Sequence, residues 1–232
     1  MRQALTILVG IALAMGGGLC HAATESNTVA FDAAFAVRAI AALAESYVGG
    51  LVESMHTLAA TEELRAGNWD RMVNLLATFE ESALTYDSWF LLPDGAYYKV
   101  ETGLQSANLS DRAYFAAVMG GEATLGDLVH SRSTGRKSMV LTVPVRDDDR
   151  IIGALGVTLY LEELGALLAN AVRLPVTIGF YATGQDGRVS LCPSNPEMLL
   201  EAGSTVPINR AVGGIQISAP LGWTFVLGTF EE

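Results

Sequence analysis

The sequence has few of the residues from which enzymes and metal sites are commonly built. Its 232 residues include only two cysteines and three histidines. It contains no phosphate-binding glycine loop, no G-x-S-x-G nucleophile turn and no H-E-x-x-H zinc motif. His56 and His130 are far apart and have no cysteine near them, so they do not predict a zinc site. We therefore expect no enzyme activity, no metal site and no cofactor.

Positive charge is also scarce. The chain has 14 Lys and Arg against 25 Asp and Glu, which gives a formal net charge of −11 at pH 7. Affinity for nucleic acid comes largely from neutralising phosphates with basic side chains. Electrostatic binding to an anionic membrane surface has the same requirement. The composition therefore argues against nucleic acid as a partner.

Apolar runs of membrane-spanning length are not expected beyond the first 22 positions. Arg2 supplies a short basic start, residues 4–15 an apolar segment, and Cys20-His21-Ala22 small residues where a signal peptidase cuts. This predicts a signal peptide over residues 1–22 and a periplasmic or secreted protein. An uncleaved segment that anchors the chain to the inner membrane is the alternative. Cleavage leaves Cys192 without a cysteine partner, so the fold must be stable without an internal disulfide.

Helical periodicity dominates the next part of the chain. Apolar residues recur every three or four positions from Val29 to Leu58, which predicts one long amphipathic helix. Gly49 and Gly50 weaken this helix near its middle. Its apolar stripe packs either on the core alone or also on a second copy of the chain. A second helix is expected after Asn68, which is a good N-cap residue.

Five strands are predicted after residue 85, over residues 86–92, 97–101, 125–131, 137–145 and 150–159. Pro93-Asp94-Gly95 is the turn between the first two strands. Short polar joints connect the last three strands, which makes them antiparallel neighbours. A helix over 111–119, capped by Ser110, and another over 162–172 complete the unit. The expected fold is α+β, a five-stranded antiparallel sheet with flanking helices behind a long N-terminal helix.

The C-terminal part is expected to form a small antiparallel β extension. Two hairpins are predicted, one from residues 176–182 and 189–191 and one from residues 214–219 and 223–230. This segment is too short to repeat the preceding unit. We therefore divide the chain into a signal peptide (1–22), a main domain (23–172) and a truncated second β module (173–232).

Arg112 is the residue with the strongest chemical argument. It is expected in the first turn of the short helix, where free backbone N–H groups and a partial positive charge attract anions. Its guanidinium is a planar fork that pairs with a carboxylate, and Tyr114 adds a hydroxyl and a ring. The structural alternative is that Ser110 and Asp111 cap the helix while Arg112 pairs with Asp111 or another carboxylate.

The order of five short motifs resembles extracytoplasmic Cache domains, the PAS-like sensor domains of bacterial chemoreceptors and sensor kinases. The resemblance covers roughly residues 29–172 and includes the long N-terminal helix. The motifs are Leu92-Pro93-Asp94-Gly95, Asn108-Leu109-Ser110-Asp111-Arg112-Ala113-Tyr114-Phe115, Ser133-Thr134-Gly135, Leu141-Thr142-Val143-Pro144-Val145 and Ile152-Gly153-Ala154-Leu155-Gly156-Val157.

The resemblance implies a small-molecule pocket between the sheet and the loops and short helix over it. Arg112 and Tyr114 match the positions that often hold a ligand carboxylate in relatives. Amino-acid-binding relatives usually have an aspartate on the last strand that receives the ligand amine, and Thr158 stands at or next to that position. Because a threonine cannot neutralise an ammonium group, we expect a small organic carboxylate without an amine. The weaker candidates on strands that should cross the pocket are Trp89, Tyr97, Ser138 and Thr142.

These observations predict an exported, ligand-binding sensor module. The sequence continues into no transmembrane or output segment, so we expect the module to signal in trans to a membrane receptor or sensor kinase. A homodimer through the long N-terminal helix is one of the two interpretations left open for its apolar stripe. The competing interpretation is a structural or protein-interaction module of the cell envelope with no small ligand.

Overall fold

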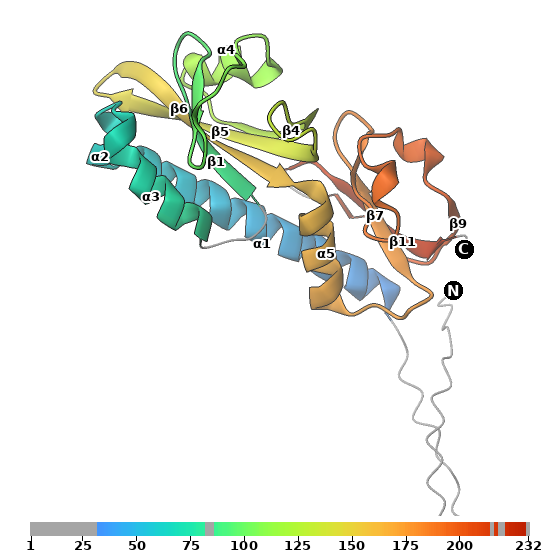
Figure 1. The fold of residues 1–232 in the computed structure, drawn as a ribbon. Coiled ribbons are helices and arrows are strands. Elements are labelled where there is room, and N and C mark those ends of the chain that lie inside the picture. The colour runs from blue at the N-terminus through green and yellow to red at the C-terminus, as the bar shows by residue number, and fades with distance from the viewer. Residues whose placement is uncertain (1–31, 82–85, 214–215, 218–220, 231–232) are drawn as a thin grey trace, which may run out of the picture.

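Two antiparallel sheets and one long helix that runs behind both of them form the architecture (Figure 1). The computed structural model describes residues 32–81, 86–213, 216–217 and 221–230. The expected signal peptide over residues 1–22 lies outside the described residues, as does most of the expected strand over 214–219. The predicted fold class, α+β with a long N-terminal helix and a small C-terminal sheet, is confirmed.

The larger sheet has six strands in the order β3-β2-β1-β6-β5-β4, and all neighbours are antiparallel. The strands are β1 (Tyr86–Leu91), β2 (Tyr97–Lys99), β3 (Gly103–Leu104), β4 (Thr124–His130), β5 (Lys137–Asp147) and β6 (Arg150–Tyr160).

The sixth strand, β3, is a difference from the predicted five-stranded sheet. Its two residues, Gly103 and Leu104, pair with Lys99 and Tyr98 of β2. A two-residue strand is too short to show an alternating pattern in the sequence. The five expected strands are all present, with ends shifted by one or two residues.

Helices cover both faces of the larger sheet. They are α1 (Ala33–Ala59), α2 (Glu62–Arg65), α3 (Trp69–Glu81), α4 (Ala113–Met119) and α5 (Leu161–Val172). Helices α1, α2 and α3 lie on one face, and α4 lies on the other (Figure 1). Asn68 Oδ1 accepts the Asp70 amide at 2.9 Å at the start of α3, as its N-cap position predicts.

The expected cap of α4 is wrong. The residue at the N-cap position is Arg112, in an extended conformation, and no side chain caps the helix. Ser110 lies in the loop before it, where its amide donates to Asn108 Oδ1 at 2.9 Å. The side chain of Asn108 therefore shapes this loop locally, and the helix begins two residues later than predicted.

The smaller sheet has five strands, β7 (Gly179–Thr183), β8 (Val189–Leu191), β9 (Ile208–Ala211), β10 (Gln216–Ile217) and β11 (Thr224–Phe230). Its main order is β10-β11-β7-β8, and β9 also pairs with β11. Strand β9 was not predicted, because it follows two short 3₁₀ turns, η1 (Pro196–Met198) and η2 (Gly203–Thr205), in a stretch expected to be a loop. The proposed boundary at residue 172 stays a prediction, although α5 ends there.

Helix α1 joins the two sheets. It contacts β5 and β6 of the larger sheet, β10 and β11 of the smaller sheet, and α5. Ile40, Ala44 and Met55 on its packed side are fully buried. α1 is also long and apolar enough to cross a membrane by length and composition, which corrects the expectation that no such stretch lies beyond residue 22. In this fold its apolar side is a layer of the core.

Candidate functional site

Five of the seven candidate residues line one small pocket on the α4 side of the larger sheet. Tyr114 comes from α4, Arg112 from the residue before it, and Trp89, Tyr97 and Thr158 from β1, β2 and β6. The rings of Trp89 and Tyr114 lie with their centroids 6.0 Å apart. The structure thus brings together five side chains that are up to 69 positions apart in the chain. Strand periodicity alone did not determine that they share one face of the sheet.

Ser138 and Thr142 have the same strand parity as Val140, which lines the pocket, but they do not reach it themselves. The Ser138 hydroxyl donates to the Arg136 carbonyl at 3.1 Å. The Thr142 hydroxyl lies 2.7 Å from the Thr124 hydroxyl. Both side chains are fully buried, and each hydroxyl already has a hydrogen-bond partner within the protein. Nothing in their placement directs them to a ligand.

Trp89 and Thr158, two lining residues of the pocket, are hydrogen-bonded to each other. Trp89 Nε1 donates to Thr158 Oγ1 at 2.9 Å, so the hydroxyl of Thr158 already has a donor. Gly156 makes room for this arrangement, since a Cβ there would collide with the Trp89 ring. The position of the Trp89 ring on the sheet therefore depends on Gly156 of the neighbouring strand β6.

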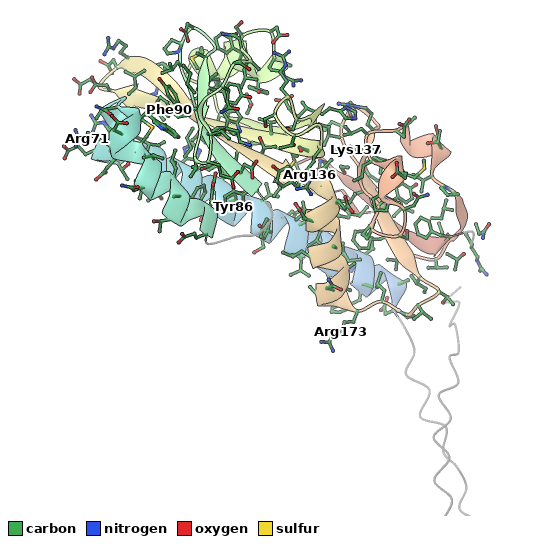
Figure 2. All side chains as sticks on the ribbon, in the orientation of Figure 1. Arg71, Tyr86, Phe90, Arg136, Lys137 and Arg173 are labelled. Carbon is green, nitrogen blue, oxygen red and sulfur yellow. The ribbon has the colours of Figure 1, made fainter. Side chains whose placement is uncertain are left out.

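No carboxylate lines this pocket. Asp87, on the same face of β1 as Trp89, is neutralised nearby: Lys99 Nζ donates to its Oδ2 at 2.8 Å, and the Tyr160 hydroxyl donates to the same atom. Arg136 lies near the start of α5 (Figure 2). Its guanidinium stacks over the Tyr160 ring at 3.7 Å and pairs with Glu163, in the first turn of α5. The polar network beside the pocket is thus internally balanced.

Two arginines line the pocket, although sequence reasoning singled out only one. Arg112 Nη2 donates to the His130 carbonyl at 3.1 Å. Arg132 donates in the opposite direction, to the Asn108 carbonyl and to the Asp111 carboxylate. We call these three bonds the arginine clasp, since they join the loop before α4 to the turn after β4. The structural alternative expected Arg112 to pair with Asp111 or another carboxylate. In the structure Asp111 pairs with Arg132 instead.

Two of the sequence motifs form turns that support the arginine clasp. The first, Pro93-Asp94-Gly95, is bonded to the loop that carries Arg112. Gly95 has φ +86°, and any Cβ there would lie 2.8 Å from the Ser110 amide nitrogen. Leu109 N donates to the Gly95 carbonyl at 2.8 Å, and Asn108 Nδ2 donates to the Asp94 carbonyl at 3.0 Å. The Pro93-Asp94-Gly95 turn therefore supports the loop that carries Arg112.

The turn after β4 presents Arg132 in a similar way. Ser131 N donates to the Arg136 carbonyl at 2.9 Å, and Gly135 N donates to the Ser131 carbonyl at 2.8 Å. The Ser133-Thr134-Gly135 motif closes this turn. That motif was the one available signal for Arg132, which lies directly beside it.

The two pocket tyrosines remain protonated hydroxyl groups. Burial raises the pKa of Tyr114, and it raises the pKa of Tyr97 against the opposing effect of Lys99 and the two arginines. The hydroxyls are therefore hydrogen-bonding groups and not bases. The volume of the pocket is about 30 Å³, close to the room that one water molecule occupies in the liquid.

The described residues contain no group of three or more His, Cys, Asp or Glu side chains that could hold a metal ion. Comparison with protein-family models and with curated proteins gives no match. Comparison with solved structures does. The ligand-binding domain of the Pseudomonas aeruginosa chemoreceptor PctB, in complex with L-Arg, has a TM-score of 0.67 at 16% identity, covering 84% of this chain and 92% of that one.

Two further chemoreceptor domains are similar. The ligand-binding domain of Campylobacter jejuni Tlp3, in complex with L-valine, has a TM-score of 0.63 at 11% identity and covers 85% of this chain and 91% of that one. The P. aeruginosa PctC domain, in complex with GABA, has a TM-score of 0.60 at 15% identity and covers 82% and 94%. The chain has the fold of a chemoreceptor sensor domain. The Cache-type resemblance of the sequence is thereby confirmed for the fold.

The similarity to these chemoreceptor domains extends over the part of the fold that contains the pocket. The neighbours span most of the chain, so their similarity includes the smaller sheet as well as the larger one. Both neighbours are ligand-binding domains of chemoreceptors. The pocket of Arg112 and Tyr114 lies between the larger sheet and α4, where the resemblance implied that a ligand would bind.

Proposed function

We propose that this protein is an exported sensor module that binds a small organic carboxylate without an amine in the pocket of Arg112 and Tyr114. The observation that carries the proposal is a pocket lined by two guanidinium groups and by no carboxylate of its own. Such a surface favours an anion, and a guanidinium fork matches the geometry of a carboxylate.

The polar groups around the pocket also argue against an amine. Thr158 accepts a hydrogen bond from Trp89, and Asp87 is occupied by Lys99 and Tyr160. A buried ammonium group would therefore lack a counter-charge, which is costly. L-valine, L-arginine and GABA, the ligands named for the neighbours, all contain a carboxylate. GABA lacks an amine on its α-carbon, so the fold is compatible with ligands outside the α-amino acids.

Binding requires the pocket to open. A volume of about 30 Å³ is an order of magnitude below the roughly 300 Å³ at which small-molecule pockets begin. Arg112 and Arg132 both line the pocket, and the bonds of the arginine clasp to Asn108, Asp111 and His130 are made by the same two arginines that would hold the ligand. We propose that the ligand carboxylate replaces the clasp contacts, so that binding changes the position of the loop before α4.

The proposal includes location and partners. The basic and apolar pattern of residues 1–22 supports export to the periplasm or the outside, with an anchored form as the alternative. The likeness to chemoreceptor domains supports a membrane receptor or sensor kinase as the partner that receives the signal in trans. The small pocket volume favours one competing function, a structural or interaction module with no small ligand.

Thermal shift and isothermal titration calorimetry with acetate, lactate, pyruvate, succinate and malate test the proposal. A ligand that binds only the folded protein, at a hundred times its Kd, stabilises it by about 2.7 kcal/mol. Arg112→Ala should weaken binding about tenfold or more, since a charge-assisted contact contributes about 1.5–3 kcal/mol. Arg150→Ala, on an exposed arginine of the β5–β6 turn, is the matched control and should bind normally.

Three results would count against the carboxylate proposal. Binding of amino acids but of none of these acids would move the ligand class to compounds with an amine. Carboxylate binding that survives Arg112→Ala would move the site. No binding of any tested acid or amino acid would favour the interaction module.

A further inference from the structure

Residues 131–136, the turn between β4 and β5, contact both the carboxylate pocket and α5. We call these residues the β4–β5 turn. Its first three residues, Ser131, Arg132 and Ser133, line the pocket. Its last residue, Arg136, lies near the start of α5 (Figure 2). The turn is therefore placed to connect the pocket with this helix.

Hydrogen bonds across the β4–β5 turn make it a compact unit. Ser131 N donates to the Arg136 carbonyl at 2.9 Å, and Gly135 N donates to the Ser131 carbonyl at 2.8 Å. The Ser138 hydroxyl donates to the same Arg136 carbonyl at 3.1 Å. Because these bonds join the two ends of the turn, we expect a displacement of Arg132 to displace Arg136 as well.

Arg136 is bound to the first residues of α5. Its guanidinium carbon lies 3.7 Å from the centre of the Tyr160 ring, and its Nη2 pairs with Glu163 Oε1 at 2.6 Å. Tyr160 is the N-cap residue of α5, and Glu163 is in its first turn. Glu163 Oε2 is buried and has no hydrogen-bond partner among the described residues. Arg136 is thus the counter-charge of a partly buried carboxylate, so moving it away is costly.

Helix α5 contacts parts of the molecule that lie outside the pocket. It packs on α1 and on β8, and its Leu161, Leu164 and Leu168 are fully buried. Along the chain it leads from β6 of the larger sheet to β7 of the smaller sheet (Figure 1). A change in the packing of α5 would therefore affect both sheets.

A second connection between the turn and α5 is weaker. Lys99 Nζ donates to the Ser133 hydroxyl at 3.4 Å and to Asp87 Oδ2 at 2.8 Å, and the Tyr160 hydroxyl donates to the same Asp87 oxygen. The contact at Ser133 is longer than the roughly 2.7–3.2 Å of a usual N–H···O bond. Most of the coupling should therefore pass through Arg136.

We propose that Arg136 transmits the state of the arginine clasp to α5. With the clasp closed, Arg132 restrains the β4–β5 turn, and the turn holds Arg136 on Tyr160 and Glu163. When the clasp opens, the turn loses this restraint and the first turn of α5 is held less firmly. That a ligand opens the clasp rests on the proposed function, whereas the contacts between the turn and α5 do not depend on it.

Hydrogen–deuterium exchange of the full chain without ligand tests the coupling, with the exchange rates of the α5 amides as the readout. Arg132→Ala opens one side of the clasp and should raise these rates about twofold or more, a size typical of coupling between separate sites. In an Arg136→Ala or Glu163→Gln background, Arg132→Ala should have at most half this effect on the logarithm of the rate. Arg150→Ala, on an exposed arginine of the β5–β6 turn, is the control and should leave α5 unchanged.

This comparison separates transmission from a structural role. If Arg136 only stabilised α5, Arg136→Ala would raise α5 exchange by itself and leave the effect of Arg132→Ala intact. Glu163→Gln keeps the size of the side chain and removes its charge, so it gives a second reading should Arg136→Ala fail to fold. An Arg132→Ala effect that is absent, or that both backgrounds leave whole, would overturn the proposal.

Exchange at a saturating concentration of the best carboxylate tests the bound state. We expect the ligand to change α5 exchange about twofold or more in the wild type, and to have at most half this effect on the logarithm of the rate in Arg136→Ala. A carboxylate that binds without changing α5 exchange would overturn the proposal as well. If no carboxylate binds, the proposed function fails, while the ligand-free comparison still decides the role of Arg136.

Discussion

At the scale of single residues, the two arginines of the pocket bind groups that lie 18 or more positions away in the chain. The Arg112 guanidinium donates to the His130 carbonyl, 18 positions later in the chain, and the carboxylate of the adjacent Asp111 pairs with Arg132. Both arginines line the pocket, and under the proposed function a ligand carboxylate replaces these contacts. Asp111 is the internal competitor of an anionic ligand.

Asp111→Asn should raise the affinity for a bound carboxylate by roughly twofold to fivefold, the range typical of exposed ion pairs. The Arg132 guanidinium holds the pKa of Asp111 below its usual value, so Asp111 is ionised and competes throughout the neutral range. Calorimetric titration of Asp111→Asn with the best carboxylate measures the change. Asp149→Asn controls for the lost charge. An unchanged or weaker affinity would show that the clasp does not compete with the ligand.

At the scale of elements, the long helix α1 carries more apolar surface than the core covers. Phe35 and Leu43 are 71% and 40% exposed, and they lie eight positions apart on one helix face. The stripe of Ile40, Ala44 and Met55 on the other side is fully buried. The core explains the buried stripe but does not cover Phe35 and Leu43 among the described residues. We propose that these two side chains contact a second copy of the chain, one of the two interpretations that the sequence left open.

The double variant Phe35→Glu/Leu43→Glu should remain monomeric under conditions in which the wild type dimerises. Its charges would face each other across an interface that buries these side chains. Light scattering after size exclusion, across a range of concentrations, measures the mass. Leu104→Glu, on the exposed edge strand β3, is the matched control at 58% exposure. A wild type that stays monomeric, or a double variant that still dimerises, would contradict the α1 dimer.

At the scale of the whole molecule, the two sheets share one hydrophobic core. Residues of β1, β5 and β6 and residues of β7, β8 and β11 belong to the same cluster of buried side chains, with α1 and α5 between them. Cys192, the cysteine without a partner, is buried in this cluster as well. A core that is continuous across both sheets predicts that they unfold together.

Phe225→Ala, in the smaller sheet, should therefore lower the stability of the entire chain by about 3–5 kcal/mol, the cost of deleting a fully buried ring. Urea unfolding followed by far-UV circular dichroism and by tryptophan fluorescence measures it. We expect both signals to shift together in a single transition. Leu104→Ala, on an exposed side chain, should change the stability by less than about 0.5 kcal/mol. Two separate transitions, with only one shifted, would show that the sheets are independent units.

The sequence by itself determined the elements that carry strong periodicity and punctuation. The long helix, the five longer strands of the larger sheet, the Pro93-Asp94-Gly95 turn and the β7–β8 hairpin follow from local patterns, because turn angles and apolar spacing are properties of neighbouring residues. The short strands β3 and β9 were not predicted from the sequence, because two to four residues contain no periodic signal. They are stabilised by the strands beside them.

Only the tertiary structure decided which side chains meet. Strand parity placed Trp89 and Thr158 on the pocket face, and no local pattern reveals this because a one-residue slip reverses the faces. Ser138 and Thr142 have the parity of the pocket residue Val140, and only their positions along β5 keep them out of the pocket. Arg132 became part of the site through packing between segments far apart in the chain. Charges and hydrogen bonds are satisfied in three dimensions, so the sequence could name Arg112 and Tyr114 but not the groups that surround them.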